Sequence, residues 1–237
     1  MIDILRFTLP AFAMAAVAFL VANRRVTARV RRDRWIKFAT YLVIVHTVLA
    51  AAAFGTGPIV LLLSLVALLG FIETIRAAQH LDASSAATVV LVFMMAATGM
   101  IWFALHAPPS RVSFLYIVIA AFDGFSQAGG QLAGRTKLAP RISPGKTVEG
   151  FLIGAGAATL CAYLLRDVAH LRAVQAVAIG VAASTAGLAG DLGASWVKRR
   201  VEIKDFGTLL PGHGGILDRF DSFLAAAAVM SIVSRWF

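Results

Sequence analysis

The sequence predicts an all-α integral membrane protein, and three observations lead to this prediction. Hydrophobic residues make up 59% of the 237 positions and charged residues only 14%, whereas a soluble domain is about 45–50% apolar and about 25% charged. The mean hydropathy is +0.83. The apolar residues also gather in segments long enough for a helix to cross the roughly 30 Å of hydrocarbon in a bilayer. We therefore expect one membrane domain over residues 1–237, with N-terminal spans in 1–110 and a catalytic half in 111–237.

Eight apolar segments account for most of the chain. Each is expected to be a transmembrane helix, because backbone groups inside a bilayer must be hydrogen-bonded within their own segment. None alternates strictly between apolar and polar residues, which argues against membrane strands. In order along the chain, the segments are residues 4–22, 36–54, 58–75, 87–105, 112–128, 150–165, 172–190 and 221–236.

The first four segments have recognisable ends. Six arginines follow the first segment instead of preceding it, so this segment is interpreted as a retained span and not as a secretory signal. A Gly-Thr-Gly-Pro turn at 55–58 separates the second segment from the third, and a Pro-Pro pair at 108–109 follows the fourth. The four tryptophans fall near predicted span ends, as an aromatic belt requires: Trp35, Trp102, Trp196 and Trp236.

The last four segments contain small residues at helical spacing. Gly150 and Gly154, at the start of the sixth segment, are interpreted as a GxxxG packing face, and Gly187 and Gly190 in the seventh favour close approach of another helix. Cys161, the only cysteine, lies in the sixth segment and is interpreted as a packing residue, because one cysteine excludes an internal disulfide.

The orientation follows from the distribution of Lys and Arg. The connections 23–37, 76–86, 129–149 and 191–220 hold 17 of the 22 basic residues, which places these connections in the cytoplasm and both termini outside. The formal net charge of +10 is therefore interpreted as the positive-inside bias and not as a sign of nucleic-acid binding. We expect a multi-pass protein of the cell (inner) membrane.

Two of the cytoplasmic connections, residues 123–150 and 191–221, are expected to be functional loops. The second holds a dense cluster of both signs, and ionisable residues near a bilayer are costly enough to indicate function. Asp218 and Asp221 are three residues apart and so share a helix face. Mg²⁺ takes one or two carboxylates together with phosphate oxygens and water, and we expect Asp191 and Asp218 to supply that pair.

The bases and glycines of the second loop suit a triphosphate. Lysine and arginine side chains neutralise phosphate, and glycines allow backbone amides to approach it. Other interpretations remain open at this point: the two acids could be helix N-caps, the basic run could be a membrane anchor, and Lys204 could form a surface pair with Asp205. The candidate phosphate ligands are Lys198, Arg199, Lys204, Arg219, Gly212, Gly214 and Gly215.

The first loop contains Ser143-Pro-Gly-Lys-Thr147, which looks like the end of a P-loop but fails the test for one. Pro140 stands where the motif needs glycine, and an apolar segment precedes the loop where a strand is required. Lys146 and Thr147 remain candidates for phosphate contact. Two acids are less informative. Glu149 could cap its helix or pair with a base, and Glu73 is expected to pair with Arg76 at helical spacing.

Two motifs resemble those of a known family, the phosphatidate cytidylyltransferases or CDP-diacylglycerol synthases. Residues 137–150, KLAPRISPGKTVEG, are similar to that family's second cytoplasmic motif. The usual Asp-Thr-Gly-Ala-Tyr start of the first motif is replaced here by Asp123-Gly-Phe-Ser-Gln127. The family signature is matched by Ser195-x-x-Lys198-Arg199-x₄-Lys204-Asp205-x-Gly207-x₂-Leu210-Pro211-x-His213-Gly214-Gly215-x-x-Asp218-Arg219-x-Asp221.

The resemblance implies an integral membrane enzyme, often a homodimer, that joins CTP and phosphatidate to give CDP-diacylglycerol and pyrophosphate. It implies Mg²⁺ at Asp191 and Asp218, and the number of cations is left open. The catalytic residues implied are Asp191, Asp218, Lys198, Arg199 and Asp221. The substrate-binding residues implied are Asp123, Ser143, Lys146, Thr147, Ser195, Lys204, Asp205, His213, Gly214, Gly215 and Arg219.

The expected reaction is in-line attack of a lipid phosphate oxygen on the α-phosphorus of CTP, with the metal and the bases offsetting charge. Asp221 and His213 are expected to orient other groups, because a phosphate monoester needs no strong general base. Three alternatives are kept: a CTP-dependent polyprenol or lipid kinase, a paralogue with a different lipid phosphate or none, and a transporter or channel. A transporter predicts acids near the middle of several spans, whereas here they cluster at one face.

Overall fold

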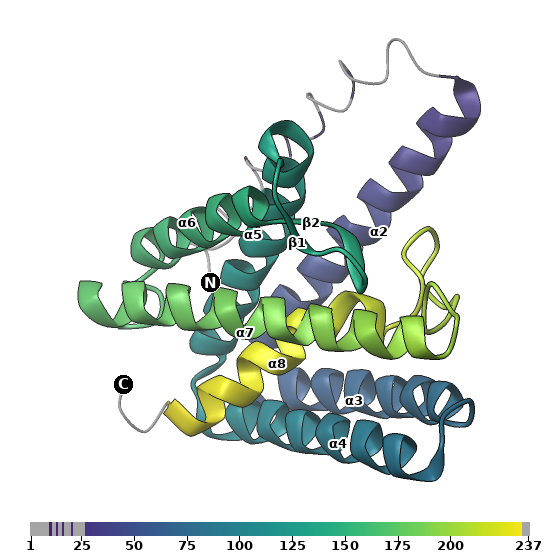
Figure 1. Cartoon of the computed structure of the whole chain (residues 1–237). Helices are drawn as coiled ribbons and strands as arrows, with labels where there is room; N and C mark the ends of the chain where they lie inside the picture. The colour runs from purple at the N-terminus through teal and green to yellow at the C-terminus, as the bar shows by residue number, and fades with distance from the viewer. Residues whose placement is uncertain (1–9, 11–12, 14–15, 17–19, 21–26, 234–237) are drawn as a thin grey trace.

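The computed structural model describes residues 10, 13, 16, 20 and 27–233. The predicted first span, residues 4–22, therefore lies outside the described residues apart from four isolated positions. The described part of the chain forms helices and one two-stranded antiparallel hairpin (Figure 1). These elements are α2 (Ala28–Ala53), α3 (Thr56–Ala78), α4 (Ala83–His106), α5 (Pro109–Ala133), β1 (Lys137–Ala139), β2 (Ser143–Thr147), α6 (Val148–Leu164), α7 (Ala173–Arg200) and α8 (Leu217–Val233).

Each of the seven predicted spans after the first corresponds to one of these helices, so the prediction of a mainly helical membrane protein is confirmed. Five helices, α2, α3, α4, α5 and α7, are long and apolar enough to cross a membrane. The apolar helix α6 is shorter, with 17 residues. The total of eight spans and the side on which the termini lie stay predictions.

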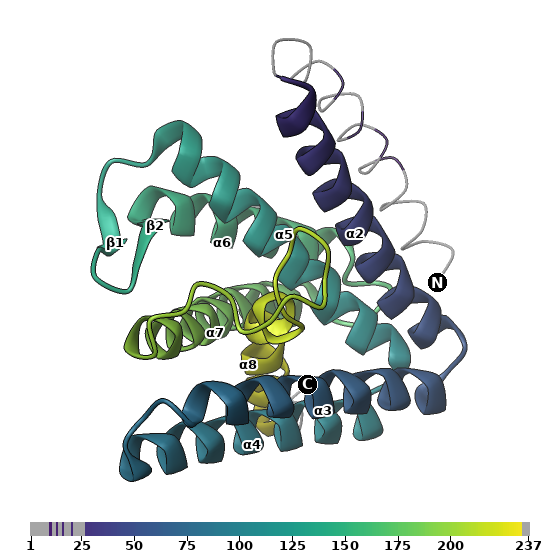
Figure 2. The same ribbon diagram turned by 90° about the vertical axis from the view of Figure 1, so that its right-hand side faces the viewer.

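Most helices pack against the helix that precedes or follows them in the sequence, and α8 connects two of these groups. α3 lies beside α4, α5 beside α6, and α6 beside α7, while α8 contacts both α4 and α7 (Figures 1 and 2). The largest fully buried side chains include Phe114 and Phe122 of α5 and Phe223 of α8. Figure 2 shows the hairpin projecting beyond the ends of α5 and α6.

Two helices extend well beyond their apolar segments. α5 continues to Ala133 and α7 to Arg200, so Asp123 and Asp191 lie within helices and not in loops. In α5 the extension begins at Gly129, which is buried against Ile153 of α6. In α7 three bases occupy the last turn, where the helix dipole favours positive charge.

Glycines set the closest helix contacts, as predicted. A Cβ at Gly154 would lie 2.8 Å from the backbone oxygen of Phe122, and one at Gly150 would lie 2.7 Å from that of Ser126. The GxxxG face of α6 therefore packs directly on α5. A Cβ at Gly190 would lie 2.5 Å from the backbone oxygen of Asp221, so α7 and α8 also meet at a glycine.

The hairpin was not predicted from the sequence. Lys137 of β1 pairs with Thr147 of β2, and the Thr147 hydroxyl then accepts the Gly150 N–H at 3.1 Å as the N-cap of α6. The Glu149 carboxylate accepts the backbone N–H groups of Arg135 and Thr136 at 3.0 and 3.1 Å. These bonds close the base of the hairpin and settle the open question about Glu149.

Candidate active site

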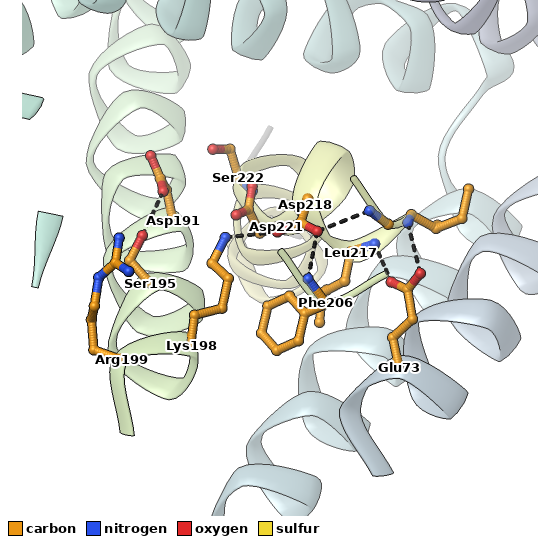
Figure 3. Close-up of polar contacts among 12 residues, drawn as sticks. Glu73, Asp191, Ser195, Lys198, Arg199, Phe206, Leu217, Asp218, Asp221 and Ser222 are labelled. Carbon is orange, nitrogen blue, oxygen red and sulfur yellow. Dashed lines mark hydrogen bonds and ion pairs between the residues drawn. The ribbon is translucent and has the colours of Figure 1, made fainter. Parts of the chain in front are cut away.

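Asp218, in the first turn of α8, is almost completely buried and fully hydrogen-bonded. Its Oδ1 accepts a hydrogen bond from Lys198 Nζ at 2.7 Å in an ion pair whose side chains are only 12% and 2% exposed. Its Oδ2 accepts the backbone N–H groups of Phe206 and Gly215 at 2.7 and 2.9 Å (Figure 3). One carboxylate therefore joins α7, α8 and the connection between them.

Asp191 lies two helical turns before Lys198 on the same side of α7. The Lys146 Nζ of β2 forms an ion pair with its Oδ2, and the Ser195 hydroxyl donates to its Oδ1 at 3.3 Å. The two segments interpreted as functional loops, residues 123–150 and 191–221, thus meet at this carboxylate.

Lys146 is a fixed positive charge at this meeting point. Burial lowers the pKa of its ammonium, but the charges of Asp191, Asp123 and Asp221 and the bond to Asp191 outweigh that effect and raise the pKa above its ordinary value. A raised lysine pKa means that the group is protonated at every pH near neutrality. Lys146 can therefore offer an ammonium to phosphate oxygens.

Two further acids approach from other helices. Asp123 of α5, Asp191 of α7 and Asp221 of α8 lie close enough to interact electrostatically. The Ser222 hydroxyl donates to Asp123 Oδ1 at 3.2 Å, which links α8 to α5. Asp123 was predicted from its motif, whereas Ser222 lies one residue past the signature and carries no sequence signal of its own.

Four other candidate residues take no part in the two lysine–aspartate ion pairs. Arg199 donates through Nε to the backbone oxygen of Ile142 at 3.2 Å, so its guanidinium ties α7 to the hairpin turn. Arg219 is exposed but within electrostatic range of Asp123. Lys204 is exposed. Partial burial and the nearby Arg219 charge lower the pKa of His213, which favours the neutral form of its ring.

The connection from residue 201 to 216 is shaped by glycines. Gly212 and Gly214 have φ angles of 73° and 81°, which favour glycine. A Cβ at Gly214 would lie 2.8 Å from Asp218 Oδ2 and 3.0 Å from the Asp205 side chain, so this glycine lets the loop close over Asp218. Ser143 pairs with Ala139 in the hairpin.

The prediction for Glu73 was wrong. Its carboxylate does not pair with Arg76 but accepts the backbone N–H groups of Ile216 and Leu217, at 3.0 and 2.8 Å, across 143 residues of sequence (Figure 3). Helical spacing suggested the local partner, and the true one could not be found without the fold.

An apolar cavity of about 410 Å³ lies next to the cluster, between α4, α7 and α8. Among the residues that the structure describes, Asp221 is the one acid that lines it, and Phe206 of the connecting loop and Leu217 of α8 line it as well. The remaining lining residues are mostly aliphatic, including Val92 of α4 and Leu224 of α8. Asp221 therefore belongs both to the acid cluster and to the lining of the apolar cavity.

The carboxylates suit a hard cation such as Mg²⁺ by their chemistry. Asp191 and Asp218 each carry a lysine ammonium, which shows that both positions attract positive charge. Within residues 27–233 no three His, Cys, Asp or Glu side chains are arranged to hold a metal ion. The assignment of Mg²⁺ to Asp191 and Asp218 stays a prediction.

The fold and the site define a multi-pass helical membrane protein with one buried and one half-buried lysine–aspartate pair. The chain belongs to the cytidylyltransferase family, whose model matches residues 8–237, and the family prediction is confirmed.

Individual relatives match about half of the chain. It is 39% identical over 129 residues to a phosphatidate cytidylyltransferase of Brucella abortus (strain 9-941), covering 54% of this chain and 48% of the relative. It is 44% identical over 115 residues to one of Bacillus subtilis (strain 168), covering 48% and 43%. It is also 36% identical over 126 residues to the uncharacterized protein YnbB of Escherichia coli (strain K12), covering 53% and 42%. The matched region is thus under half the length of each relative.

Proposed function

We propose that this chain transfers the cytidylyl group of CTP to phosphatidate, giving CDP-diacylglycerol and pyrophosphate, with Mg²⁺, at the cytoplasmic face of the cell membrane. Membership of the cytidylyltransferase family supports the reaction type, and relatives named phosphatidate cytidylyltransferase support the acceptor. The observation that carries the proposal is the position of two lysine–aspartate pairs beside an apolar cavity. A lipid phosphate needs positive charge beside its phosphate group and an apolar space for its acyl chains.

In this reaction a non-bridging oxygen of the lipid phosphate forms a bond to the α-phosphorus of CTP. The bond from that phosphorus to the oxygen bridging to the β-phosphate breaks, and the electron pair leaves with pyrophosphate. Because the lipid phosphate is already ionised at neutral pH, no strong base is required. Lys146 and Lys198 would offset the negative charge on the reacting phosphates.

Asp191 and Asp218 would hold Mg²⁺ in this proposal, and Mg²⁺ would supply Lewis-acid polarisation of phosphate oxygens. Lys146 and Lys198 would then move from the carboxylates to the phosphates. Such an exchange keeps each buried charge paired, which matters because an unpaired buried charge is costly.

Labelled CTP tests the reaction directly. Purified protein in mixed micelles with phosphatidate and Mg²⁺ should place an α-phosphorus label in the lipid and release labelled pyrophosphate from γ-labelled CTP. Chelation with EDTA should remove lipid labelling, and excess Mg²⁺ should restore it. A γ-label in the lipid would identify a kinase instead, and labelling that persists in EDTA would contradict the metal requirement.

The apolar cavity is expected to take the lipid's acyl chains, and filling it tests this role. Gly193 lines the cavity, and a Cβ there would meet no atom within 4 Å, so Gly193→Leu introduces an apolar side chain at the cavity with no clash at its Cβ. We expect the KM for phosphatidate to rise about tenfold, which corresponds to roughly two displaced CH₂ groups. The KM for CTP should not change.

Gly156→Leu is the matched control, because Gly156 lies in α6, is exposed, and also has no atom within 4 Å of its added Cβ. Both KM values should stay at the wild-type level in this variant. An unchanged phosphatidate KM in Gly193→Leu would show that the acyl chains bind elsewhere.

A further inference from the structure

Glu73 is a buried acid on α3, a helix that carries none of the sequence motifs. Glu73 is only 6% exposed, and both oxygens of its carboxylate accept hydrogen bonds. Oε1 accepts the Ile216 N–H at 3.0 Å, and Oε2 accepts the Leu217 N–H at 2.8 Å. α8 begins at Leu217, so Glu73 binds the N-terminus of the helix that carries Asp218 and Asp221.

The physical chemistry of a helix N-terminus explains why a carboxylate sits here. The first N–H groups of a helix have no partner within the helix, and the helix dipole favours negative charge at this end. Asp218 Oδ2 bonds the Gly215 N–H just before the helix, so Glu73 and Asp218 together satisfy three consecutive amides. The buried charge of Glu73 is compensated by these bonds.

Two glycines of the connecting loop make room for Glu73. A Cβ at Gly207 would lie 2.6 Å from Glu73 Oε1, and a Cβ at Gly215 would overlap the Glu73 carboxylate. The resemblance implies that Gly215 binds substrate. In the structure Gly215 also lacks the Cβ that would displace the Glu73 carboxylate, so this position requires glycine for packing against Glu73.

We propose that Glu73 is a positioning residue for the transfer reaction: by binding the first amides of α8 it holds Asp218 and Asp221 opposite α7. The proposal rests on the proposed function, but the contact itself does not. Leu217 immediately precedes Asp218, so the anchor fixes the start of α8 one residue from the carboxylate that pairs with Lys198. A rotation of α8 about its axis would carry both acids away from α7.

Glu73→Gln tests the proposal with two readouts. The amide nitrogen of glutamine is a donor and cannot accept either backbone N–H, so one bond is lost and a donor faces a donor. We expect hydrogen exchange at Ile216 and Leu217 to accelerate at least about tenfold, and turnover per folded molecule to fall about 10–100-fold, as for other groups that orient metal ligands. The KM for CTP should change by less than about threefold, because β2 and α7 still bind it.

Glu202→Gln is the matched control, since Glu202 is an exposed acid in the same connecting loop. It should leave both exchange and turnover unchanged. Gly207→Ala provides a second variant that keeps the charge but displaces the carboxylate, and it should reproduce both effects. Gly57→Ala, on the same helix as Glu73 and with no atom within 4 Å, controls for this change.

The outcomes separate the two proposals. Wild-type exchange rates in Glu73→Gln and Gly207→Ala would overturn the anchor, and faster exchange with full turnover per folded molecule would overturn its role in positioning. If the wild-type chain itself transfers no label from CTP, the proposed function fails, and the exchange measurement still decides whether Glu73 anchors α8.

Discussion

Asp218→Asn is expected to reduce CTP-dependent labelling of the lipid at least about a hundredfold, the size of effect seen when one preorganised charged or polar group is removed from a transfer site. The substitution removes the charge that pairs with the buried Lys198 ammonium. It also places an amide NH₂ where Oδ2 accepts the N–H groups of Phe206 and Gly215, or where Oδ1 accepts from Lys198. Either orientation leaves a donor facing a donor.

The same variant should be less stable. Removing one partner of a buried ion pair costs about 3–5 kcal/mol, because the other charge remains buried. The unfolding midpoint in detergent and the initial rate of labelling measure the two effects separately. Lys198→Met combined with Asp218→Asn should recover part of the stability and none of the activity, since the double change removes both charges.

Asp33→Asn is the comparison for this prediction. Asp33 pairs with Lys37 at 2.8 Å, but the Asp33 and Lys37 side chains are 55% and 49% exposed. Such a pair contributes about 0–1 kcal/mol, so this variant should keep wild-type stability and turnover. An Asp218→Asn protein that labels lipid at close to the wild-type rate would remove Asp218 from the chemistry.

The sequence predicts the helices well because burial in lipid imposes a strong and simple pattern. Every described helix coincides with a predicted apolar segment. The pattern fails where a helix continues past its apolar segment but stays packed against the protein. Gly129 is buried in α5 by contact with Ile153 of α6, although it lies just past the end of the predicted segment at residue 128. For this reason the ends of α5 and α7 could not be predicted.

The site was predictable in part. The order of acids, bases and glycines identified both motifs, and the structure joins them through Lys146 and Asp191. Which base meets which acid was not predictable, because Lys146 and Asp191 are 45 positions apart and belong to different elements. The roles assigned to individual residues, and the shared metal at Asp191 and Asp218, stay predictions.

Residues that support the site were the hardest to predict. Glu149 closes the hairpin through two backbone amides, and Glu73 anchors α8 in the same way. Backbone amides carry no side-chain signature, so a sequence pattern shows the acid but not its partner. Local spacing then favours a nearby base, as it did for Glu73 and Arg76.

Lys146→Met is the second variant with a large expected effect, and it separates the two lysines of the site. Methionine has a similar length but no charge, so Asp191 loses its ion-pair partner and the phosphates lose an ammonium. We expect turnover to fall about a hundredfold, as for other positively charged clamps on a transferring phosphate. The loss should not recover at any pH between 6 and 9.

The pKa of Lys146 is raised above its ordinary value of 10.5, so the wild-type ammonium is charged throughout this window and its contribution is lost only at higher pH. Lys146→Arg keeps the charge and should retain more activity than Lys146→Met, although a planar guanidinium fits the lysine position imperfectly.

Asp191→Asn should lose as much activity as Lys146→Met, and it should also raise the Mg²⁺ concentration needed for half-maximal labelling. If Lys146→Met and Asp191→Asn both label lipid at the wild-type rate, the junction of the two motifs is not where CTP reacts.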